Sequence, residues 1–188
     1  MWRLLLLLSA IVIAAALVAR WWFGLRVLQE FGDRPCRCDL ARWTPILPET
    51  EVVMRAEESA YEFGRQLRLK ALAEWRGDDP KGAASRTGTK RFGMAVPPLS
   101  GIVAVMAAVV AKIPAMGAIS IFLAAIALSA VFGVLSLAGE LAAINRAARK
   151  MRETRGFTRS DDEEAVIRCA MAHAWADTFP PILKVIQR

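Results

Sequence analysis

The sequence predicts an all-α polytopic membrane protein with three transmembrane helices and cytoplasmic amphipathic helices. The chain has 188 residues, of which 55% are apolar and 23% are charged, and its mean hydropathy is +0.35. A chain this apolar that also carries so many charges must keep the two kinds of residue in separate segments. One stretch, Phe92 to Gly139, holds a single ionisable residue, Lys112.

That stretch predicts a transmembrane helical hairpin over residues 92–139. As a single helix its roughly 48 residues would extend ~70 Å, more than twice the ~30 Å hydrocarbon core of a bilayer. A lysine near the bilayer centre costs about 3 kcal/mol, so Lys112 is expected in the loop of the hairpin. The two antiparallel spans are predicted at Pro97–Ala111 and Pro114–Gly139.

The N-terminal residues 1–26 predict a further transmembrane anchor. Leu4–Ala19 is an uncharged apolar run between Arg3 and Arg20. The aromatic residues Trp21, Trp22 and Phe23 follow it and suit the headgroup region. A cleaved signal peptide is the alternative, because a short charged start, an apolar centre and the alanines at 14–16 also meet its description.

The distribution of Lys and Arg predicts the orientation of these spans. Basic residues concentrate before the hairpin and after it, whereas Lys112 is the residue expected on the opposite side. The positive-inside rule then places the N-terminus outside and the C-terminus in the cytoplasm of a bacterial-type plasma (inner) membrane. The net charge of +7 lies next to apolar spans, so we expect membrane lipids rather than nucleic acid as its counterpart.

The segment 27–91 is predicted to be a cytoplasmic helical region and linker. Gly24–Pro48 is rich in turn residues and shows no strand pattern. Glu51–Arg76 carries apolar residues at three- and four-residue spacing, which predicts an amphipathic helix. Asp78–Lys90 is composed of small, polar and charged residues and predicts a flexible tether to the hairpin.

The C-terminal segment, residues 140–188, is predicted to form two cytoplasmic helices. The first continues the third span to Arg155 and stops at Gly156, and the second runs from Ser160 to about Phe179. The first helix carries a basic cluster that we interpret as lipid-facing, and anionic headgroups would attract each charge by about 1 kcal/mol. The cluster consists of Arg146, Arg149, Lys150, Arg152 and Arg155. Ordinary topology-setting charge is the alternative interpretation.

Small residues recur every four positions on the third span, at Ala125, Ser129 and Gly133. Such spacing lets helix backbones approach closely, which favours helix association in lipid. The stripe predicts a packing face, and its partner is either the second span or another membrane subunit, including a second copy of the chain.

A structural zinc site is one interpretation of the cysteines and the histidine. Cys169 and His173 are four residues apart, and Cys36 and Cys38 are expected on the same side of the membrane. Together they would make a Cys3His set for a closed tetrahedral zinc. The alternative is that they are buried residues of the core, in which case the chain needs no cofactor.

The C-terminal half resembles the membrane-embedded neutral zinc metallopeptidases. The resemblance lies in the layout of anchor, hairpin and final helices, and in the segments Glu140-Leu-Ala-Ala-Ile-Asn-Arg-Ala-Ala-Arg149-Lys-Met, Gly156-Phe-Thr, Asp162-Glu-Glu-Ala and Arg168-Cys-Ala-Met-Ala. It implies a peptidase ancestry with a zinc motif of the form His-Glu-x-x-His on a helix.

The zinc motif itself is not retained. The nearest stretch is Ala56-Glu57-Glu58-Ser59-Ala60-Tyr61, in which Glu57 and Tyr61 occupy the positions of the two imidazoles. The prediction is therefore a pseudo-metallopeptidase without catalytic residues: a structural, assembly or adaptor subunit of a larger membrane complex. The alternative is a divergent membrane zinc metallopeptidase.

Overall fold

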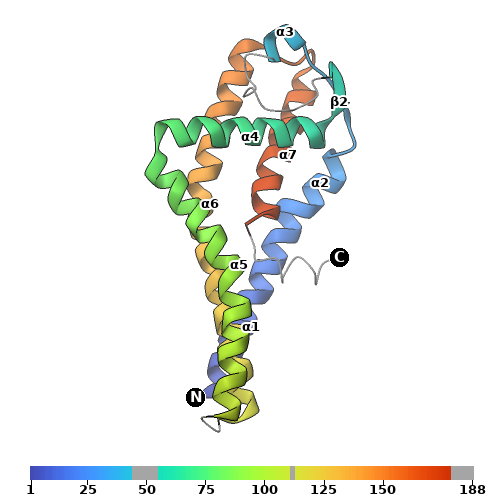
Figure 1. Cartoon of the computed structure of the whole chain (residues 1–188). Helices are drawn as coiled ribbons and strands as arrows, with labels where there is room; N and C mark the ends of the chain where they lie inside the picture. The colour runs from blue at the N-terminus through green and yellow to red at the C-terminus, as the bar shows by residue number, and fades with distance from the viewer. Residues whose placement is uncertain (44–54, 111–112, 179–188) are drawn as a thin grey trace. The chain divides into compact units, whose positions relative to one another are not determined.

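The chain is an all-α, multi-pass membrane protein whose described residues include a short pair of strands. A computed structural model describes residues 1–43, 55–110 and 113–178 (Figure 1). Three helical segments are long and apolar enough to cross a membrane: Trp2–Phe31, Pro80–Val109 and Ala115–Thr154. This confirms the predicted all-α class and the prediction of three helices suited to span a membrane; the cytoplasmic placement of the amphipathic helices stays a prediction.

The chain divides into two compact units, each gathered from separate segments. The span unit comprises residues 1–20, 85–136 and 177–188, and the core unit comprises residues 21–84 and 137–176.

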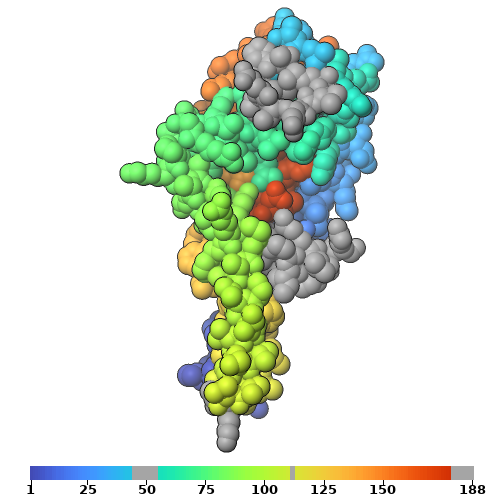
Figure 2. All heavy atoms as spheres, in the orientation of Figure 1, coloured from blue at the N-terminus to red at the C-terminus, as the bar shows by residue number. Residues whose placement is uncertain are grey.

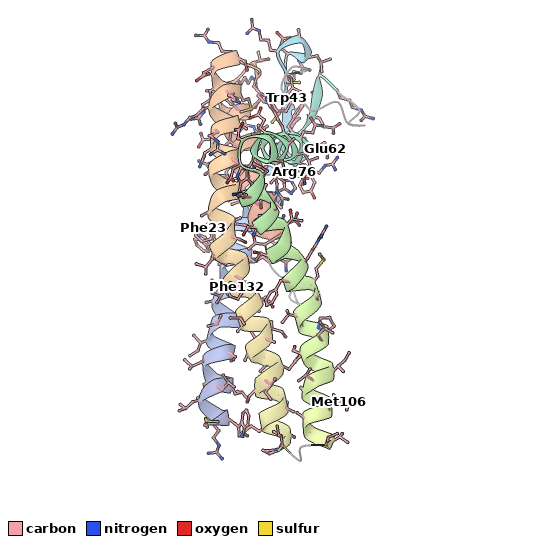
Figure 3. The ribbon with its side chains drawn as sticks, turned by 60° about the vertical axis from the view of Figure 1, so that its left-hand side comes forward. Phe23, Trp43, Glu62, Arg76, Met106 and Phe132 are labelled. Atoms are coloured by element: carbon pink, nitrogen blue, oxygen red, sulfur yellow. The ribbon has the colours of Figure 1, made fainter. Side chains whose placement is uncertain are left out.

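The span unit contains three helices that lie side by side (Figures 1 and 3). They are α1 (Trp2–Arg20), most of α5 (Pro80–Val109) and the first half of α6 (Ala115–Thr154). The Ser120 hydroxyl donates to the backbone oxygen of Trp2 at 3.1 Å, which joins α6 to α1. The rings of Phe92 and Phe132 meet edge to face at 5.8 Å and join α5 to α6. The predicted loop residue Lys112 lies outside the described residues.

The predicted tether at Asp78–Lys90 is wrong, because α5 begins at Pro80 and continues through the span. Proline is favoured at the first position of a helix, and the Asp79 carboxylate accepts the backbone N–H of Gly82 at 2.9 Å. The span was expected to begin at Pro97, but α5 passes through Pro97 and Pro98. Transmembrane helices tolerate prolines in their interior, and one turn later in α5 the Ser100 hydroxyl donates to the Pro97 oxygen at 2.8 Å.

The core unit is built around α4 (Ala60–Asp78), which lies across α6 and α7 (Ser160–Ala176) in Figure 1. Its centre is aromatic: the ring of Trp43 meets the rings of Phe63 and Phe157 edge to face at 5.5 and 5.1 Å. Gly64 allows α4 to approach α7, since a Cβ at this position would lie 2.6 Å from the Cβ of Cys169.

The segment expected to be irregular, Gly24–Pro48, is ordered over its described part. A π-helical turn η1 (Trp21–Leu25) leads into α2 (Arg26–Phe31), strand β1 (Pro35–Arg37) and the short helix α3 (Leu40–Trp43). Residues 44–48 lie outside the described residues. The strand escaped sequence analysis because three residues are too few to show an alternating pattern.

Helix α4 begins at Ala60, nine residues later than its predicted start at Glu51. The preceding residues Glu57–Ser59 form strand β2, which pairs antiparallel with β1 so that Cys36 stands opposite Glu58. Ser59 then caps α4, and its hydroxyl accepts the backbone N–H of Glu62 at 3.3 Å. Pairing with a distant strand therefore overrides local helix periodicity here.

The helices after the third span agree closely with expectation. Helix α6 extends without a break to Thr154, and α7 begins at Ser160. The residue that leaves the helical conformation is Arg155, with φ 49°, rather than the predicted Gly156. Helix α7 ends at Ala176, and the predicted end near Phe179 lies outside the described residues.

Candidate functional site

The cysteines of the first strand are buried in the core unit. Because side chains alternate along a strand, Arg37 points outward while Cys36 is buried, and Cys38 after the strand is buried as well. The Cys36 sulfur lies 3.9 Å from the backbone oxygen of Asp162, and the Cys38 sulfur lies 3.7 Å from the backbone oxygen of Arg55. Each thiol therefore faces a backbone carbonyl.

Cys169 and His173 lie on the face of α7 that packs against α4. Cys169 is fully buried, and burial raises its pKa to about 12. Burial likewise raises the pKa of Cys36 to about 11. The His173 ring lies edge-on to Tyr61, and its Nε2 is 3.1 Å from the Tyr61 backbone oxygen. Both thiols thus stay protonated at neutral pH, whereas the thiolate is the nucleophile and the metal ligand.

The four residues considered for zinc are not assembled as ligands. Within residues 1–43, 55–110 and 113–178, no group of three or more His, Cys, Asp or Glu side chains is placed to hold a metal ion. Cys38 faces Arg55 and His173 faces Tyr61, so the set of Cys36, Cys38, Cys169 and His173 does not converge. The zinc interpretation rested on the four-residue spacing of Cys169 and His173 within α7. That spacing is local and does not determine the directions in which Cys36 and Cys38 point.

The stretch compared with the metallopeptidase motif is a strand rather than a helix. Glu57 and Glu58 belong to β2, and Tyr61 is the second residue of α4. The Glu57 carboxylate pairs with Arg37 at 3.0 Å, and the Glu58 carboxylate pairs with Arg55 at 3.6 Å. Both carboxylates therefore serve as partners of neighbouring arginines on the strand pair.

A buried ion pair at the centre of the core unit was missed by sequence analysis. The Arg68 Nε lies 2.7 Å from Glu140 Oε1, and the Glu140 side chain is 0% exposed. In the sequence, Glu140 directly follows the predicted span Pro114–Gly139. The sequence feature that could have indicated this pair is the position of Arg68, which directly follows Leu67 on the apolar face of α4 and so lies at the edge of the buried face. Its pairing with Glu140 joins α4 to α6.

All five members of the predicted basic cluster are exposed, and two of them also form ion pairs. Lys150 pairs with Glu74 at 3.1 Å, and Glu74 also holds Lys70 at 3.3 Å. Arg152 pairs with Glu163 at 3.0 Å. Three further members of the cluster are exposed: Arg146, Arg149 and Arg155. The interpretation of this cluster as lipid-facing stays a prediction.

The predicted small-residue stripe is used inside the span unit. The Ser129 hydroxyl is buried and donates to the Ala125 backbone oxygen at 2.8 Å. A Cβ at Gly133 would lie 2.7 Å from the Thr178 backbone oxygen. The Gly133 oxygen also accepts Arg86 Nη1 at 2.9 Å, and Arg86 Nη2 donates to the Thr178 hydroxyl at 2.9 Å. Gly133 therefore contacts residues of its own chain.

Comparison with protein-family models, curated proteins and solved structures finds no match to this chain. The resemblance to the metallopeptidases accordingly stays a prediction from the sequence. The chemistry available at the candidate site is that of the residues described above: buried protonated thiols, a histidine held at a backbone carbonyl, and a buried ion pair.

Proposed function

We propose that this chain is a non-catalytic integral membrane protein that serves as a structural, assembly or adaptor subunit of a larger membrane complex. The observation that carries the proposal is the use of the reactive side chains of the core unit in internal contacts. The Glu140 carboxylate pairs with Arg68, the His173 ring meets the Tyr61 carbonyl, and the Cys169 thiol is buried.

The proposal includes a location and an orientation. The chain resides in a bacterial-type plasma membrane with its N-terminus outside and the core unit in the cytoplasm. The support is the distribution of charge in the sequence: Arg86, Lys90 and Arg91 precede the apolar part of α5, whereas Lys112 is the single basic residue in the sequence between Phe92 and Gly139. In the cytoplasm the thiols stay reduced.

The exposed basic face of α6 is the surface we assign to the partner. Arg146, Arg149 and Lys150 recur at three- and four-residue spacing and so share one side of the helix. The carboxylate of Glu74 is shared between Lys150 and Lys70, so the face keeps an excess of positive charge. An acidic surface on a neighbouring subunit would complement it.

Affinity purification in a mild detergent, followed by identification and quantification of bound proteins, tests this function. We expect a second protein or a second copy in a fixed ratio, and its loss in Arg146→Glu/Arg149→Glu. Arg76→Glu, at an exposed arginine of α4, is the matched control and should retain the partner. A strictly monomeric protein without a bound partner would contradict the proposal. Retention of the partner with loss of anionic lipid alone would assign the face to lipid instead.

The alternative, a divergent membrane zinc metallopeptidase, rests on the resemblance of the C-terminal segments around Glu140–Met151 and Asp162–Ala172 to that family. Metal analysis and a proteolysis assay of the full chain separate the two functions. Stoichiometric zinc together with proteolysis that is lost in Glu58→Gln would favour the enzyme and overturn the adaptor function.

A further inference from the structure

A groove opens on the span unit where α5 changes from polar to apolar sequence. Gly88, Thr89 and Phe92 of α5 and Phe132 of α6 line it, and its volume is about 350 Å³. The two aromatic rings form its apolar side and remain partly open to the surroundings, with Phe92 39% and Phe132 43% exposed. Figure 2 shows the face of the span unit that α5 covers, in light green.

Helix lengths place this groove at the edge of the hydrocarbon layer. Phe92 lies about 26 Å along α5 from Val109, and Phe132 lies about 26 Å along α6 from Ala115. Figure 3 shows Met106 near the end of α5 and Phe132 farther along α6. Since the hydrocarbon core is ~30 Å thick, the phenylalanines reach its far boundary when the loop is at the near one. Gly88, one turn earlier on α5, then lies at headgroup depth.

The polar end of the groove has space and positive charge. A Cβ placed on Gly88 would meet nothing within 4 Å. Arg91 follows three residues later and is exposed. Residues three apart are neighbours on a helix surface, so Arg91 lies on the same side of α5 as Gly88, next to the residues that line the groove. An anionic group seated at Gly88 would therefore lie beside a cation and above an aromatic floor.

We propose that this groove binds one anionic phospholipid, with its phosphate at Gly88 and Arg91 and an acyl chain over Phe92 and Phe132. A free phosphate would use the polar half alone, and a neutral lipid the apolar half alone. The basic face of α6 is a weaker candidate for headgroups, because Lys150 lies about 27 Å along the helix beyond Phe132, and each headgroup layer is only ~5–8 Å thick. The lipid site does not depend on the proposed subunit function.

Native mass spectrometry of the full chain, reconstituted with phosphatidylglycerol and phosphatidylcholine of identical acyl chains, tests the site. We expect one tightly retained phosphatidylglycerol per chain. Arg91→Gln should weaken its retention about fivefold, as the loss of one interfacial cation predicts. Gly88→Leu should displace the phosphatidylglycerol, because the leucine side chain would fill the open space at Gly88. Since leucine is a better helix former than glycine, α5 should stay folded.

Two matched variants separate this site from general effects on the protein. Gly77→Leu changes a glycine whose Cβ position is equally open, and Arg76→Gln removes an exposed arginine from α4. Both should retain phosphatidylglycerol as the wild type does. Equal retention of the two lipids by the wild type would overturn the proposal, and so would unchanged retention in both Gly88→Leu and Arg91→Gln.

Discussion

The two units differ in where they place their large apolar side chains. The core unit buries aromatic and branched side chains among its alanines, with Trp43 and Phe63 each 1% exposed and Leu67 fully buried. In the span unit buried residues such as Ala104, Ala130 and Ser129 are small, while large apolar residues face outward, with Val109 73% and Leu135 68% exposed. The same chain thus follows two different packing rules.

The difference follows from the solvent around each unit. Water drives large apolar side chains into a core because their burial removes apolar area from water. Lipid tails offer the same apolar surroundings as a protein interior, so helices in a membrane associate through close backbone approach and hydrogen bonds instead. The serines of α6 fit this second rule, since Ser120 and Ser129 are buried and donate to backbone oxygens.

The largest predicted effect concerns the ion pair of the core unit. Glu140→Ala removes the carboxylate at the buried guanidinium of Arg68 and should lower the free energy of unfolding of the core unit by about 3–5 kcal/mol. Hydrogen exchange of α4 and α7, measured by mass spectrometry, should speed up while that of α1 does not. The double variant Arg68→Met/Glu140→Leu should recover most of the loss. Unchanged exchange of α4 in Glu140→Ala would show that the pair does not hold this unit together.

A smaller effect is expected from the close approach of α4 and α7. Gly64→Ala would place a Cβ 2.6 Å from Cys169 Cβ and 2.8 Å from Ala170 N, and should cost about 1–3 kcal/mol by overpacking. Gly77→Ala on the same helix meets nothing within 4 Å and should stabilise α4 by about 0.5–1 kcal/mol. Urea midpoints of the two variants check the prediction. Equal urea midpoints for the two variants would mean that α4 and α7 can move apart without a loss in the free energy of unfolding.

The smallest effect is a pH dependence from the buried thiols. Burial raises the pKa of Cys36 to about 11 and that of Cys169 to about 12, from an ordinary value of 9.0. Unfolded thiols therefore ionise first as the pH rises, so their contribution to stability is complete at neutral pH, begins to fall as the pH approaches 9, and is lost as the folded thiols ionise near pH 11–12. Between pH 7 and pH 9 we expect a loss of about 1 kcal/mol.

Urea unfolding of the Cys36→Ala/Cys169→Ala variant is the control for this effect, because Lys and Tyr also titrate at alkaline pH. The wild type should lose more stability than the variant over the same pH interval. Parallel losses in the two proteins would contradict the assignment to these thiols.

The sequence by itself determined the membrane architecture. Apolar length and the absence of charge from 92–111 and 113–139 are local properties, and a bilayer of ~30 Å admits few ways to satisfy them. For the same reason the continuation of α6 to Thr154 and the start of α7 at Ser160 were predictable, since helix periodicity and capping act within a few residues.

Only the tertiary structure decided which polar residues meet. Arg68 and Glu140 are far apart in sequence, as are Cys36 and the Asp162 oxygen that its thiol faces. Nothing local distinguishes a Glu at the end of a span from a Glu inside a buried ion pair, because the outcome depends on which helix packs against it. The strand pair β1 and β2 shows the same limit, since each three-residue strand exists only through the other.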